Sequence, residues 1–149
     1  MIVELSTELL APADRVWSAV RRSDTFRHVT KGVLGFRVPG GLPPTLREGE
    51  SVTGRLMLFH VLPLWRHEIR VESVDDRELV IQTREHGGPL RRWDHRISVR
   101  QSMGPRSLYT DRVDIGGGPL APPTWVFVQV FFRYRQYRWR GLARTLGGR

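Results

Sequence analysis

Alternation of apolar and polar residues marks several segments of the chain as β-strands. In residues 92–100, Trp93, His95, Ile97 and Val99 fall on one face, and mostly charged residues fall on the other. The same period of two runs through 2–10, 50–60, 65–72, 79–85 and 107–115. Strands with one apolar and one wet face are typical of an antiparallel sheet that is covered on one side.

Two short helices are expected after the first of these strands. Pro12 suits the first turn of a helix within 11–22. Ser23 can cap a second helix over 24–29. The stretch 39–44 is rich in proline and glycine and predicts a loop before the next strand.

The segment 122–146 predicts a long amphipathic helix, although aromatic and basic residues run all along it. At ~1.5 Å per residue it spans roughly 37 Å, which is enough to cross a whole sheet. One arc of its helical wheel collects Trp125, Val128, Phe131, Phe132, Trp139, Leu142, Ala143 and Leu146. The opposite arc collects Gln129, Arg133, Gln136, Arg140 and Arg144. We therefore expect the first arc to cover the inner face of the sheet and the second to face water.

The composition is that of a globular protein, with 40% hydrophobic and 26% charged residues among 149. The chain has no cysteine, which excludes disulfides and thiolate metal sites. No apolar run approaches the ~20 residues needed to span a bilayer, and the N-terminus lacks a signal-peptide pattern. A cytoplasmic protein without a transmembrane segment is the expectation.

The formal net charge is +9, and Lys31 is the only lysine among 24 basic residues. A basic chain can attract nucleic acid or an anionic membrane. Because the arginines are spread along the chain rather than clustered, we expect no specific nucleic-acid site and at most weak contact with an anionic surface. The pattern leaves the oligomeric state open.

The order of elements and three stretches resemble the START-like (SRPBCC, helix-grip) superfamily, especially its bacterial polyketide cyclase/dehydrase-type members. The stretches are "ELLAPADRVWSAVRRSDTF", "GGPLRRWDHRISV", and "SLYTDRVDI" with the later "FFRYRQYRWRGLARTL". The resemblance covers nearly the whole chain. It implies an α+β fold, in which a curved antiparallel sheet of about six to seven strands wraps round the C-terminal helix. It also implies one ligand-binding domain over residues 1–149, with a lipophilic cavity between sheet and helix. Members bind lipids, sterols, polyketides or plant hormones, and some cyclise polyketides.

Arg135 falls inside the apolar arc of the last helix, and Asp111 points to the inner face of its strand. An arginine aimed at a core is costly unless it is paired. We therefore expect Arg135 and Asp111 to meet, or both to line the cavity. Three roles stay open for Arg135: a structural ion pair, a ligand anchor, or a side chain that extends to solvent.

His67 and His95 both lie on inner faces, each two residues after a tryptophan, Trp65 or Trp93. With Asp111 they could supply acid–base catalysis, so His95, His67 and Asp111 are the catalytic candidates. No metal-ligand spacing is present, and neither a metal nor another cofactor is expected.

We predict that the protein binds a lipophilic small molecule, such as a lipid or a polyketide, in this cavity. The expected ligand-binding residues are Trp65, His67, Thr83, Glu85, Trp93, His95, Tyr109, Asp111, Trp125, Phe132 and Arg135. One alternative is a cyclase/dehydratase-type enzyme that uses the same His and Asp groups. A second is a basic surface that binds nucleic acid or an anionic membrane. No catalytic motif decides between binding and catalysis, so enzymatic activity stays open.

Overall fold

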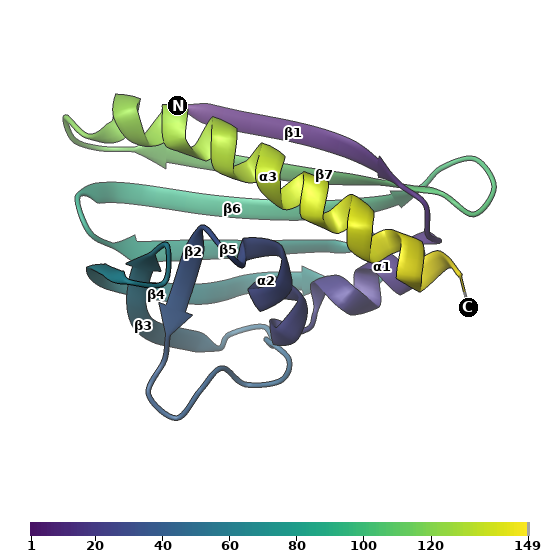
Figure 1. Cartoon of the computed structure of the whole chain (residues 1–149), viewed down its shortest axis with the longest axis horizontal. Coiled ribbons are helices and arrows are strands. Elements are labelled where there is room, and N and C mark those ends of the chain that lie inside the picture. The colour runs from purple at the N-terminus through teal and green to yellow at the C-terminus, as the bar shows by residue number, and fades with distance from the viewer. Residues whose placement is uncertain (149) are drawn as a thin grey trace.

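Seven strands form one antiparallel sheet in this computed structural model, in the order β1-β7-β6-β5-β4-β3-β2 (Figure 1). The structure describes residues 1–148. The strands are β1 (Ile2–Leu9), β2 (Leu34–Arg37), β3 (Ser51–Leu58), β4 (Leu62–Asp75), β5 (Val80–Gly87), β6 (Leu90–Gln101) and β7 (Ser107–Gly116). The helices are α1 (Ala13–Val20), α2 (Ser23–Thr30) and α3 (Ala121–Gly147). This order confirms the predicted α+β helix-grip class.

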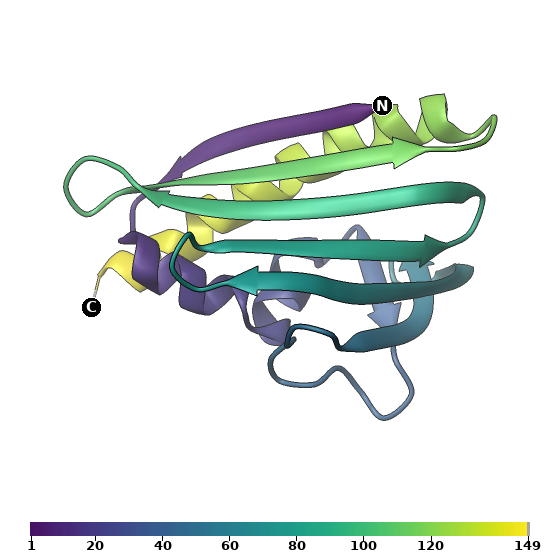
Figure 2. The ribbon, with the colours of Figure 1, turned by 180° about the vertical axis from the view of Figure 1, so that it is seen from behind.

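The helices pack on the inner side of the sheet. Figure 1 shows α3 running diagonally across the strands, and α1 and α2 contribute to the core on the same side. The view from behind shows the outer side without a covering layer (Figure 2). There Arg112 pairs with Glu4 at 2.8 Å, and Arg84 lies 3.5 Å from both Glu72 and Asp94. Each such pair contributes under ~1 kcal/mol, and together they keep this face exposed to solvent, as the alternation predicts.

No helix within residues 1–148 is both long and apolar enough to cross a bilayer.

Two groups of buried side chains hold α3 against the sheet. In one group, the rings of Trp139 and Tyr109 have centroids 4.9 Å apart and pack with Trp17 of α1. In the other, Phe132 packs with Ile115 and its neighbours on β7. Burying a side chain of this size contributes about 2–3 kcal/mol. The helix is therefore fixed to the sheet in its middle and in its C-terminal half.

The prediction that Gln136 faces water is wrong, because its side chain is only 6% exposed. Its amide donates to the carbonyl of Leu5 at 2.7 Å and to Asp111 at 3.5 Å. Since these partners satisfy the amide, the polar side chain is buried at little cost. The other residues of the predicted wet arc, Gln129, Arg133, Arg140 and Arg144, are exposed or half-buried.

The segment around α2 differs from expectation in two ways. Ser23 is the first residue of α2 rather than its cap, and its hydroxyl donates to the carbonyl of Pro43. Strand β2 is absent from the predicted set because four residues with no clean alternation are too short to recognise. This strand forms the edge of the sheet beside β3.

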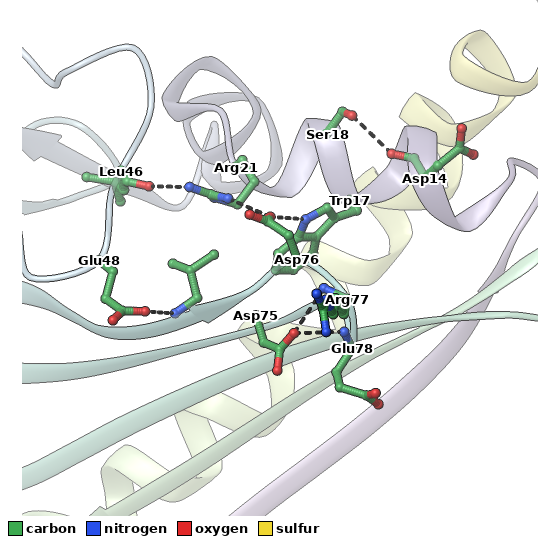
Figure 3. A network of polar contacts seen from close by, with 11 residues as sticks. Asp14, Trp17, Ser18, Arg21, Leu46, Glu48, Asp75, Asp76, Arg77 and Glu78 are labelled. Carbon is green, nitrogen blue, oxygen red and sulfur yellow. Dashed lines mark hydrogen bonds and ion pairs between the residues drawn. The ribbon is translucent and has the colours of Figure 1, made fainter.

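Asp76, in the turn between β4 and β5, ties α1 to the sheet (Figure 3). Its carboxylate accepts from Trp17 Nε1 at 2.8 Å and from Arg21 Nη1 at 2.9 Å. The other end of the Arg21 guanidinium donates to the carbonyl of Leu46 at 3.2 Å. Three separate segments are thereby joined at one end of the inner face.

Candidate functional site

A cavity of about 450 Å³ lies between α3 and the inner face of the sheet. Its wall is formed by α2, α3 and strands β2 to β6, and most of the lining side chains are apolar. A space of this size falls within the range of known small-molecule sites.

Eight of the predicted ligand-binding residues line this cavity: Trp65, His67, Thr83, Glu85, Trp93, His95, Phe132 and Arg135. Three others lie elsewhere. Tyr109 and Asp111 are fully buried behind the wall, where Asp111 contacts His95. Trp125 donates its indole N–H to the carbonyl of Ile2 at 3.2 Å, at the edge of the sheet.

The first polar group of the cavity is a histidine–carboxylate pair from neighbouring strands. His67 Nε2 on β4 lies 2.8 Å from Glu85 Oε2 on β5, and the Thr83 hydroxyl donates to Glu85 Oε1 at 3.1 Å. Burial raises the pKa of Glu85. The hydrogen bond and charge of His67, the charge of His95 and the hydrogen bond of Thr83 act the other way, and their combined effect is larger, so the pKa is lowered. An ionised Glu85 only accepts, so His67 Nε2 carries the proton that joins them. The buried Nδ1 of His67 has no hydrogen-bond partner within residues 1–148.

A second pair joins β6 to β7 behind the wall. His95 Nε2 lies 2.9 Å from Asp111 Oδ1, and the Tyr109 hydroxyl donates to the same oxygen at 3.0 Å. Burial raises the pKa of Asp111, but the charge of Arg135 and the bond to His95 outweigh it, so the pKa is lowered. Burial and the nearby Asp111 charge raise the pKa of Tyr109, which keeps the phenol protonated as a donor. Asp111 therefore holds His95 in one orientation.

Arg135 reaches the cavity from α3 and is only 6% exposed, so it does not extend to solvent. Its Cζ lies 4.7 Å from the centroid of the Phe132 ring. No ion pair within 4 Å joins Arg135 to Asp111. The two groups interact only through the longer-range charge effect that lowers the pKa of Asp111.

Aromatic rings surround these polar groups. The ring of His67 has Phe36 and Trp93 as edge-on neighbours, each with centroids 6.4 Å away. Trp65 rests against the turn between β5 and β6, where Gly88 has a φ of +69° and an added Cβ would lie 2.4 Å from the indole. Glycine at this position thus lets the turn adopt its conformation and lets Trp65 close that part of the wall.

The sequence interpretation missed several apolar lining residues, among them Phe36, Phe127 and Phe131. Phe131 lies in the predicted apolar arc of the last helix, so the helical wheel could have predicted its place in the cavity wall. Phe36 belongs to the unrecognised strand β2, and no pattern in the sequence places it opposite His67.

The chemical capacities of the site follow from these groups. Two histidines, each oriented by a carboxylate, could transfer protons within an apolar space. Arg135 offers N–H donors to an oxygen-bearing ligand. No group of three or more His, Asp and Glu side chains within residues 1–148 is arranged to hold a metal ion.

No family model and no curated protein matches this sequence. Solved structures do match. A START superfamily protein from Mycobacterium smegmatis superposes with a TM-score of 0.67 at 16% identity, over 97% of this chain and 98% of that one. An aromatase/cyclase from a Streptomyces species superposes with a TM-score of 0.70 at 15% identity, over 97% of this chain and 93% of that one. Norcoclaurine synthase from Thalictrum flavum was solved with dopamine and hydroxybenzaldehyde. It superposes with a TM-score of 0.68 at 11% identity, over 97% of this chain and 87% of that one. With the strand order and the long last helix, these likenesses show that the chain has the START-like, or SRPBCC, helix-grip fold.

Proposed function

We propose that the protein binds a lipophilic small molecule, such as a lipid or a polyketide, between the sheet and α3. The observation that carries this proposal is the cavity of about 450 Å³, whose wall is mainly apolar. Sites for small molecules combine such a wall with a few placed polar groups that orient the ligand. Here those groups are Arg135, the His67–Glu85 pair and His95.

The shared fold supports the proposal by analogy only, because one fold carries many functions. The aromatic wall adds support from the chain itself. Trp65, Trp93, Phe36 and Phe131 present flat apolar surfaces to the space without filling it. Such surfaces suit hydrocarbon chains and ring systems alike.

Uptake of the neutral dye Nile red, followed by its fluorescence, tests the proposal. Leu56→Trp adds an indole to a lining position on β3, whereas Leu108→Trp adds one to an exposed position on the outer face. We expect the wild type and Leu108→Trp to bind the dye and Leu56→Trp to lose about tenfold or more in affinity, since the added ring fills the cavity. Native mass spectrometry of gently purified protein should also show a bound lipophile. A wild type that takes up no dye and carries no lipophile would contradict the proposal.

Acid–base catalysis of the cyclase/dehydratase type is a second candidate function. The two histidine–carboxylate pairs at the cavity favour it. It predicts a bell-shaped pH–rate profile with a poly-β-ketone substrate, and loss of that rate in His95→Ala but not in His28→Ala, whose side chain is exposed on α2. Equal rates in the wild type and His95→Ala would exclude this role for His95.

A further inference from the structure

Arg135 is a buried cation that lacks a bonded partner. Its side chain is 6% exposed, and its guanidinium makes no hydrogen bond or ion pair with any other described residue of 1–148. Within the described part of the chain, the one ring stacked on it is that of Phe132. A guanidinium carries its charge permanently, and burying it without acceptors is unfavourable. The position calls for an acceptor that the described residues do not supply.

Glu85 in the cavity wall and Asp111 behind the wall are already engaged with other donors. Oδ1 of Asp111 accepts from His95 and Tyr109, and its Oδ2 faces the amide of Gln136 at 3.5 Å. Glu85 is bonded to His67 and Thr83 on the strands. Asp111 therefore offsets the charge of Arg135 at a distance but leaves its N–H groups free.

We propose that Arg135 binds the carboxylate of a lipophilic acid, an assignment that rests on the proposed ligand-binding function. A guanidinium presents paired N–H donors that match the two oxygens of a carboxylate. One unpartnered cation matches one negative charge, which favours a monoanion over a dianionic phosphate ester. Lysine would not offer the same paired donors.

The arrangement of α3 also fits an amphipathic acid. The lining side chains from Leu120, just before α3, to Phe132 are apolar except Thr124, and Arg135 follows them toward the C-terminal end of the helix. Phe127 and Phe131 are stacked along this stretch, with centroids 5.5 Å apart. The apolar body of the ligand lies along these rings when its carboxylate is at Arg135.

Dodecanoate, its methyl ester and Nile red are the probes that test this assignment, each titrated against the full chain. The acid and the ester share one apolar body and differ in charge. We expect the wild type to bind dodecanoate about tenfold or more tightly than the ester, which is the effect of one charge-assisted hydrogen-bonded contact. Arg135→Gln should lose that preference, Arg135→Lys should keep part of it, and Arg140→Gln should keep it whole, because Arg140 is exposed on the same helix.

The outcomes separate this assignment from the proposed function. Equal affinities of the wild type for acid and ester, or an unchanged preference in Arg135→Gln, would overturn the anchor while leaving the cavity as a lipophile site. Uptake of Nile red without either dodecyl probe would overturn the acid class in the same way. Failure of all three probes would overturn both. If Arg135→Gln does not fold, as its thermal unfolding would show, the acid-to-ester ratio of the wild type decides alone.

Discussion

Arg135 lies over the face of Phe132, with its Cζ 4.7 Å from the ring centroid. The two residues are three positions apart on α3, a spacing that places side chains next to each other on a helix. The same ring also contacts His95 in a T-shaped arrangement, with the two ring centroids 5.1 Å apart. Phe132 therefore contacts both the free cation and the histidine that is bonded to Asp111.

Replacing Phe132 by leucine should lower the free energy of unfolding by about 1–2 kcal/mol, through a partial void and the loss of the cation–π contact. Phe132 is 2% exposed. Denaturant unfolding measures the change. Phe127→Leu, at a half-buried position of the same helix, should cost less. An equal cost for the two variants would contradict the larger contribution expected from the burial of Phe132 and its contact with Arg135.

Gln136→Ala should destabilise the protein by about 1–3 kcal/mol, because it removes a buried amide that donates to Leu5 and Asp111. Gln129→Ala is the matched control, since the side-chain oxygen of Gln129 accepts from Arg133 of its own helix and from no other described residue. We expect its effect to stay within about 0.5 kcal/mol. Urea unfolding of both variants would reveal the difference, and similar values would show that the Gln136 bonds contribute little.

Acid should destabilise the fold through Asp111 and Glu85, whose pKa values lie below the ordinary 3.8 and 4.5. A carboxyl with a lowered pKa in the folded state stabilises it at pH values above the unfolded pKa. That contribution is lost as the pH falls through the folded pKa. The free energy of unfolding should therefore fall as the pH drops below about 4.5.

The variant Asp111→Asn should show a shallower acid dependence of the free energy of unfolding than the wild type. Asp24→Asn serves as the comparison, because a hydrogen bond from Arg22 lowers the pKa of Asp24 at the exposed surface. Solvent screens such a pair, so this variant should follow the wild-type curve closely. An Asp111→Asn curve parallel to that of the wild type would contradict the role of the buried pair.

Asp76→Ala should loosen the attachment of α1, since one carboxylate accepts from both Trp17 and Arg21 (Figure 3). We expect a loss of about 1–2 kcal/mol, a modest value because the Asp76 side chain is 71% exposed. Glu78→Ala, in the same turn, provides the control. Hydrogen exchange in α1 should rise only in Asp76→Ala, and exchange that rises equally in both would point to the turn itself.

Binding to DNA or to anionic vesicles should be weak and should vanish at about physiological salt, because the +9 charge is spread and partly paired on the outer face. Fluorescence anisotropy across a salt series measures this. Tight binding that persists at high salt would contradict this prediction and support the alternative of a basic surface that binds nucleic acid or an anionic membrane.

The alternation of side chains made most of the sheet predictable. Residues 92–100 match the centre of β6, and His95 is buried on the inner face as expected. The wheel likewise placed Arg135 on the buried side of α3. Such patterns report which face a side chain takes, and burial follows from the face.

The partners of these side chains were not predictable. His67 meets Glu85 diagonally across β4 and β5, where Ile69 is the direct partner of Glu85, and a β-bulge between Val71 and Ser73 shifts the pairing of the two strands. Gln136 is buried because a carbonyl of β1 lies opposite its amide. Register and partner geometry depend on contacts between distant segments, and the period of a single strand or helix does not contain them.

The two hydrogen bonds of Gln136 have a consequence for the helix as a whole. They connect α3 to β1 and β7, and so they fix its rotation about its own axis. Successive residues of a helix are about 100° apart, so a roll by one residue would turn Arg135 out of the cavity and bring a different side chain in. By binding to the two strands, Gln136 thus determines which side chain of α3 points into the cavity.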